Sequence, residues 1–186
     1  MQPIDRISIA RFAYHFQAET ALKTLSQAGF DTARLSVVGR GYHNEKDRVG
    51  FHEAGGQVRI WGNYGAFWGG LCGLSTGGVF LTSPSTGPVV ALGAIAALIQ
   101  RPVDVMTPSG ADALGAALYG LGIPKDSVLE CEETLKADGF LVFVHGSGAE
   151  ATRAQAILAD MKPTRLEVHE GLLAPAQRAP VVHFAA

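Results

Sequence analysis

Two stretches of the chain, one near each end, show three successive patterns of apolar and polar positions. These patterns are typical of a strand, then a helix, then a second strand. In the first, residues 7–14 are rich in the β-branched and aromatic side chains that strands favour. Apolar residues then recur at the i, i+3, i+4, i+7 spacing of one helical face, namely Ala18, Ala21, Leu22 and Leu25. Gly29 suits a left-handed helix C-cap, and residues 34–38 alternate polar and apolar as a half-buried strand does.

The second stretch repeats this order near the C-terminus. Residues 140–144 predict a strand. A helical face follows, made of Ala154, Ile157, Leu158 and Met161, and residues 165–169 then alternate polar and apolar side chains as a second strand does. A shift of 131 residues places Ile9 over Phe140. Two such βαβ units predict an α+β fold with the split βαβ arrangement of ferredoxin-like domains. Right-handed crossovers then place both helices on one face of a four-stranded antiparallel sheet.

These two stretches divide the chain into regions. The expected organisation is a discontinuous ferredoxin-like domain at 1–39 and 123–170, a polar loop at 40–62, an inserted Gly-rich helical hairpin region at 63–122, and a C-terminal arm at 171–186. Gln57–Trp61, at the end of the loop, suits a short additional strand. The arm ends in apolar residues that suit docking on a neighbouring subunit or addition to a sheet edge, and a disordered tail is the alternative.

The inserted region overlaps a stretch of 41 residues, 60–100, that contains no Asp, Glu, Lys or Arg. We expect a first helical arm at 61–82, a turn, and a return arm at 88–100. Glycines at every fourth position of the first arm form three overlapping GxxxG steps, which let helix backbones approach closely. A third helix rich in small residues is expected from about Ser109. The predicted assembly contact consists of Gly65, Gly69, Gly73, Gly77, Ala113 and Ala117.

An uncharged surface of this size must be buried in protein or in lipid, because water solvates it poorly. We favour burial in protein, between copies in a homo-oligomer or against the sheet. The membrane alternative stays open, since the first arm would reach ~30 Å, enough to cross a bilayer. The return arm of 13 residues would reach only ~20 Å, and no cluster of Lys or Arg flanks the stretch. A module that binds a small anionic or apolar ligand between hairpin and sheet is a further alternative.

Composition and charge restrict the partners and the compartment. The 186-residue chain is 17% charged with a formal net charge of −2, so it has no electrostatic footprint for nucleic acid. The N-terminus lacks the basic and apolar segments of a signal peptide, which predicts a cytoplasmic location, with membrane association only through the hairpin. Cys72 and Cys131 lie far apart without CxxC spacing, and we expect reduced thiols that pack as small apolar side chains.

The sequence contains no recognisable catalytic, cofactor-binding or metal-binding constellation. His43 and His52 lie among acidic residues but without fixed ligand spacing, which favours a solvated polar loop. His145 precedes Ser147 and Gly148 at the expected start of the last helix, where backbone N–H groups favour an anion. The alternative is that Ser147 simply caps the helix.

The segment LGIPKDSVLECEETLKADGFLVFVHG, within residues 115–146, resembles the bacterial general stress protein family, which includes heat-induced and low-temperature-induced proteins. GAFWGGLCGL and GPVVALGA resemble the same family, and the likeness extends over residues 5–170. Cys131 stands where that family usually has an aromatic residue. The resemblance implies the fold with its Gly-rich insertion and transfers no catalytic residue. We therefore expect a non-enzymatic, stress-associated protein without a cofactor that self-assembles through the Gly-rich hairpin.

Overall fold

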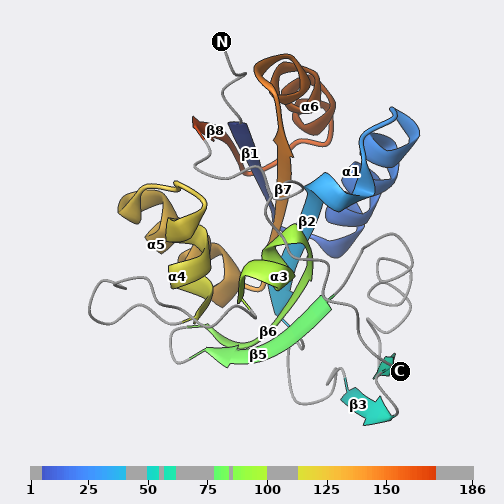
Figure 1. Ribbon diagram of the computed structural model, residues 1–186, viewed down its shortest axis with the longest axis vertical. Helices are drawn as coiled ribbons and strands as arrows, with labels where there is room; N and C mark the ends of the chain where they lie inside the picture. The colour runs from blue at the N-terminus through green and yellow to red at the C-terminus, as the bar shows by residue number, and fades with distance from the viewer. Residues whose placement is uncertain are drawn as a thin grey trace.

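The computed structural model describes residues 6–40, 50–54, 57–61, 78–83, 86–99 and 113–170. These residues form an α+β fold in which helices cover an antiparallel sheet (Figure 1). The sheet has six strands in the order β5-β6-β2-β7-β1-β8. Their bounds are β1 Arg6–Phe12, β2 Leu35–Arg40, β5 Gly78–Ser83, β6 Gly87–Gly93, β7 Phe140–Gly146 and β8 Arg165–Glu170. The strands β3 (Gly50–Ala54) and β4 (Gln57–Trp61) pair with each other in a separate two-stranded sheet.

Helices lie on both faces of the six-stranded sheet. Their bounds are α1 His15–Gln27, α3 Ala94–Ile99, α4 Ala113–Gly120, α5 Lys125–Lys136 and α6 Gly148–Asp160, and a 3-10 turn at Thr32–Arg34 precedes β2. α1 and α6 share one core cluster with Phe12 of β1, whereas α3, α4 and α5 share the other with Ile9. Figure 1 shows α1 and α6 on one side of the central strands and α4 and α5 on the other. The prediction that the first and last helices cover one face is confirmed.

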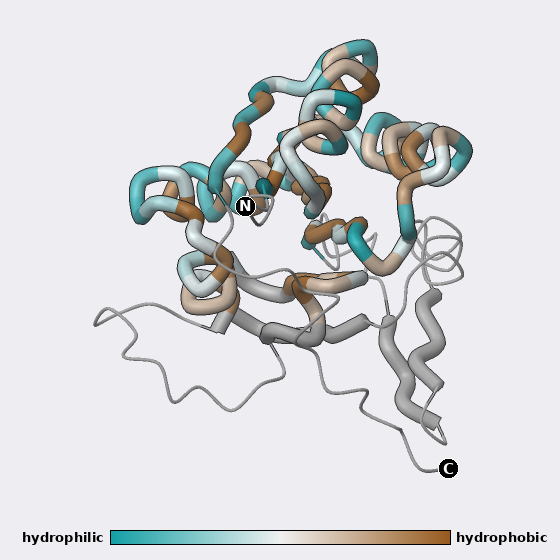
Figure 2. Tube along the Cα trace, turned by 45° about the horizontal axis from the view of Figure 1, so that its top comes forward, coloured by the Kyte–Doolittle hydropathy of each residue, from teal (hydrophilic) through white to brown (hydrophobic). Residues whose placement is uncertain are grey.

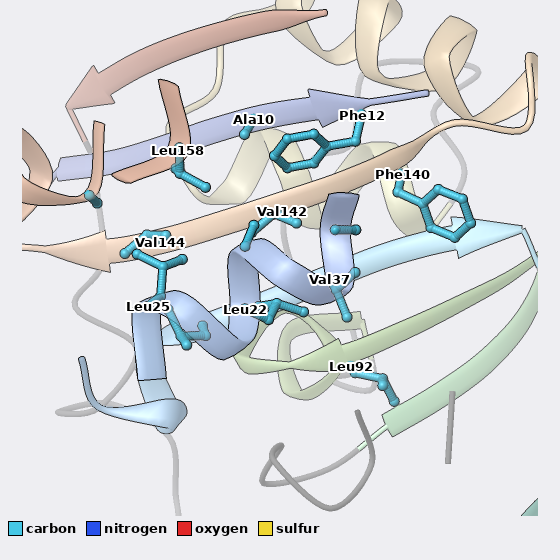
Figure 3. Packing of buried hydrophobic residues seen from close by; sticks show 14 of the residues in the cluster. Ala10, Phe12, Leu22, Leu25, Val37, Leu92, Phe140, Val142, Val144 and Leu158 are labelled. Atoms are coloured by element: carbon cyan, nitrogen blue, oxygen red, sulfur yellow. The ribbon is translucent and has the colours of Figure 1, made fainter. Parts of the chain in front are cut away.

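The face that periodicity predicts for α1 is the face that it buries. Ala18, Ala21, Leu22 and Leu25 are all buried. In Figure 3, Leu22 and Leu25 point toward Val142 and Val144 of β7. Burying a side chain of this size contributes about 1.5–3 kcal/mol to stability. Along the helices of Figure 2, hydrophilic and hydrophobic positions alternate within each turn, as expected for helices with one face on a core.

The two halves of the predicted repeat lie in one sheet. β1 and β7 are adjacent and antiparallel, with Ile9 opposite Phe143. The offset of 131 residues is nevertheless wrong for these strands, because Ile9 packs in the cluster of α5 whereas Phe140 packs in the cluster of α1. Successive side chains of a strand point to opposite faces, so an odd offset exchanges the faces. The first residues of the two strands, Arg6 and Phe140, are 134 positions apart, which keeps equivalent side chains on the same face.

The uncharged stretch differs from the prediction where the structure describes it. Residues expected in the two helical arms form the antiparallel pair β5 and β6, and β6 also pairs with β2. Their β-branched residues and Pro88 favour a strand over a helix, and β2 offers an edge to receive them. The helical prediction is therefore wrong over β5 and β6, and it is confirmed for α3 and α4. The glycine series Gly65, Gly69, Gly73 and Gly77 lies outside the described residues.

The region predicted as a polar loop also contains strands. Residues 50–54 and 57–61 form the β3–β4 ribbon, which confirms the additional strand predicted at Gln57–Trp61. Within the described ranges, none of the helices has both the length and the apolar character needed to cross a membrane. The C-terminal arm at 171–186 lies outside the described residues.

Candidate functional site

A buried arginine, Arg11 of β1, lies at the centre of a group of linked ion pairs. Its exposed fraction is only 5%, which is unusual for a charged residue. β8 runs antiparallel beside β1 with Arg165 directly opposite Arg11, and Glu167 and His169 follow on the same face of β8. α5 lies over this face and contributes Glu130. We call these five residues the Arg11 cluster.

The Arg11 guanidinium bridges two carboxylates. Its Nη1 donates to Glu130 Oε2 at 2.7 Å, and its Nη2 donates to Glu167 Oε2 at 3.0 Å. Arg165 contacts the same pair, with Nη1 at 3.0 Å from Glu130 Oε2 and Nε against Glu167 Oε1. His169 Nε2 lies 3.4 Å from Glu167 Oε2. Two guanidinium groups thus share two carboxylates, so the charges of these four groups balance.

The contacts of the cluster hold Arg11 and Glu130 in their ionised forms. Burial lowers the pKa of Arg11, but the hydrogen bond to Glu130 and the charge of Glu167 more than offset this, so its pKa lies above the ordinary value. The hydrogen bond from Arg11 is also the main cause that lowers the pKa of Glu130. Both groups therefore stay charged at neutral pH, and neither is poised to exchange a proton there.

The thiol of Cys131 lies beside the cluster but is not activated. Cys131 is fully buried in the second core cluster. Burial raises its pKa to about 11, although Arg11 acts in the opposite direction. A thiol with this pKa is protonated at neutral pH and is a poor nucleophile. The structure supports the prediction that this cysteine packs as a small apolar side chain.

The Arg11 cluster is best suited to holding elements together. It joins α5 to β1 and β8, and Arg11 is separated from its partner Glu130 by 119 positions in the sequence. The outer side chains, Arg165 and Glu130, are 54% and 41% exposed, so water screens their contact and it contributes little. In the inner pair the Arg11 side chain is 6% exposed and that of Glu167 is 13% exposed, so loss of either partner would leave a poorly solvated charge with one partner fewer.

Sequence reasoning missed this cluster, although one signal for it was present. Arg11 is a charged residue within a strand whose positions are buried from Ile7 to Phe12. A charge in such a strand needs a partner. The alternating Arg165, Glu167 and His169 of the last strand supply a charged face. Only the register in which β1 pairs with β8 shows that Arg11 lies beside this charged face.

The predicted anion site at the start of α6 is filled by the chain itself. Ser147 caps the helix, and its backbone N–H donates to Glu150 Oε2 at 2.8 Å. Arg34 Nη1 donates to the same oxygen at 2.9 Å. The bond from the Ser147 N–H is the main cause that lowers the pKa of Glu150. A carboxylate therefore already accepts from the Ser147 N–H at the start of the helix, and the capping interpretation accounts for the motif.

His145 does not help to bind an anion at this helix. It is buried, and burial, with a smaller effect of Arg34, lowers its pKa to about 4. At neutral pH it is uncharged. Its Nε2 has no hydrogen-bond partner among the described residues.

Only part of the predicted assembly contact lies within the described residues. The four glycines at 65–77 lie outside the described residues. Ala117 of α4 is buried within the protomer and is only 8% exposed, so little of it is left for contact with a second copy. The backbone of Ala113 starts α4. Of the residues predicted for the contact, the glycine series therefore remains the main candidate.

In the described part of the chain, no group of three or more His, Cys, Asp and Glu side chains is placed to hold a metal ion. His43 lies outside it, and His52 belongs to β3. Comparisons of the chain with protein-family models, with curated proteins and with solved structures find no match.

Proposed function

We propose that four strands and two helices form a ferredoxin-like core. The strand order β8-β1-β7-β2, the antiparallel pairing, and the cover by α1 and α6 support this assignment. In each unit the two strands are separated by one strand of the other unit, as in a split βαβ arrangement. β6 and β5 then extend this core beyond β2.

We propose that the protein is non-enzymatic and stress-associated, and that it self-assembles into a homo-oligomer through its Gly-rich region. One observation carries this proposal. The glycine series runs in the sequence directly into Gly78, the first residue of β5, and β5 is the last strand on its side of the sheet. The series is thereby adjacent in sequence to an edge that no other described strand covers, and such an edge can pair with a strand of another chain.

The chemistry of the described residues supports a role without catalysis. The buried charges of the Arg11 cluster neutralise one another, and the Cys131 thiol is protonated. The helix start at Ser147 is closed by Glu150. These groups are engaged in stabilising the fold, and none is arranged as a nucleophile with an adjacent base.

The two alternatives receive less support. A hairpin in the bilayer needs two helical arms, whereas residues 78–82 and 88–93 of the predicted arms belong to the sheet. A ligand site between hairpin and sheet needs space against the sheet face, but α3 and α4 pack on that face with buried residues such as Ile95 and Leu118. Self-assembly in the aqueous phase fits the described residues better.

A glycine substitution tests the assembly. Gly73→Leu should reduce the particle mass in sedimentation velocity, because a side chain at a GxxxG position holds facing helices apart. Gly120→Leu in α4 is the matched control, since a Cβ at Gly120 meets no atom within 4 Å. Its particle mass should equal that of the wild type. An unchanged mass for Gly73→Leu, with circular dichroism like the wild type, would rule out this glycine as part of the contact.

A further inference from the structure

The two edges of the six-stranded sheet differ sharply in charge. β8, at one edge, has the sequence RLEVHE and follows Pro163 closely. Charged residues and proline are common protections of an edge strand against unwanted pairing. β5, at the other edge, has the sequence GVFLTS without charge or proline. The sequence of β8 therefore protects that edge against pairing with a further strand, whereas the sequence of β5 contains no such protection.

The backbone of β5 is suited to receive another strand. Among the described strands its only neighbour is β6, to which it is paired from Gly78–Leu92 to Ser83–Gly87. In an antiparallel pair, alternate residues of the outer strand direct their N–H and C=O groups away from the partner. Six residues of strand span about 20 Å. β5 therefore presents a continuous row of outward donors and acceptors over that length.

We infer that β5 pairs with β5 of a second copy of this chain, antiparallel and about a two-fold axis. This inference deepens the proposed self-assembly and rests on it. A two-fold contact places the same strand on both sides, and an uncharged strand can face itself without opposing like charges. Antiparallel pairing also continues the pattern of every strand pair in the sheet. The result is one continuous sheet that crosses the dimer.

Hydrogen–deuterium exchange of the wild-type protein tests the contact without a substitution. Amides of residues 78–83 should exchange more slowly as the protein concentration rises through the range where the particle mass doubles. Amides of residues 165–170, at the β8 edge, should exchange at a rate that does not depend on concentration. Protection of β5 that is the same at every concentration would mean that the chain covers its own edge, for example with the C-terminal arm, and would overturn the inference.

Two substitutions extend the test. Leu81→Lys and the milder Thr82→Lys should each raise the dissociation constant at least about tenfold, because a charge is introduced on both sides of the contact. Val168→Lys adds the same charge to β8 and should leave the dissociation constant unchanged. If the wild type is monomeric, both the proposed function and this inference fail. If it assembles while its β5 amides stay unprotected, only this inference fails, and the contact lies elsewhere.

Discussion

Arg11 shows how one residue can join parts of the chain that are distant in sequence. It is the only charged residue in the buried run of β1, and its two carboxylate partners come from α5 and β8. A buried ion pair adds little compared with apolar packing, but a broken one is costly. The cluster therefore makes the position of α5 depend on β8.

Arg11→Met should lower the free energy of unfolding by about 2–4 kcal/mol, because Glu167 keeps its largely buried charge with one partner fewer. Lys23→Met is the control, since the Lys23–Glu19 pair lies on the surface of α1 and its loss should change stability by less than about 1 kcal/mol. Urea denaturation measures both. Equal effects of the two substitutions would show that the Arg11 cluster does not stabilise the fold.

His145 should make stability depend on pH. Its pKa is lowered from 6.5 to about 4, mainly by burial, so the unfolded chain binds a proton at a higher pH than the folded protein. The contribution of His145 to the free energy of unfolding is then complete above pH 6.5 and is lost as the pH drops toward 4. At pH 5 the loss amounts to about 2 kcal/mol. His145→Gln should flatten this dependence between pH 8 and 5 in urea denaturation, whereas His15→Gln should keep it. An unchanged slope in His145→Gln would contradict this account.

At the scale of elements, periodicity predicted the helices and strands of the first and last units and failed over β5 and β6. Helical spacing in α1 and α6 and alternation in β8 are local signals, and the structure confirms them. The strand predicted at residues 34–38 is confirmed as β2, but its predicted half-burial is wrong, because both faces of this strand contribute to a core cluster and residues 35–39 are all buried. β5 and β6 were predicted as helices because their many small residues suggested helix packing. The pairing of β6 with β2 depends on a strand that lies over 40 positions away in sequence, and a local pattern carries no information on such a distant partner. The Arg11 cluster was missed for the same reason.

The junction between β6 and α3 should tolerate only glycine. Gly93 has a φ of +93°, and a Cβ there would lie 2.1 Å from the carbonyl oxygen of Leu35. Gly93→Ala should therefore lower the free energy of unfolding by at least about 3 kcal/mol. Gly29 has a similar φ of +88° but no atom within 4 Å of the added Cβ. Gly29→Ala should cost only about 1–2 kcal/mol, for the backbone conformation alone. Similar losses in thermal unfolding would mean that the close approach to β2 is not formed.

At the scale of the whole molecule, the described residues form a sheet with helices on both faces and with two unlike edges. The α1 and α6 face and the α3, α4 and α5 face each have an apolar core. The faces are thus covered within the protomer, and the uncharged edge β5 is the part of the sheet best suited to contact another copy. Residues 78–83 and 87–93 of the uncharged stretch therefore belong to the sheet, and the first of these segments is also the proposed contact.

Native mass spectrometry of the wild-type protein in detergent-free buffer tests self-assembly most directly. The protomer has a mass of 19.5 kDa. Self-assembly predicts a dominant particle at an integral multiple of this mass, with protomers appearing only on dilution. A particle of 19.5 kDa at every concentration would contradict the account.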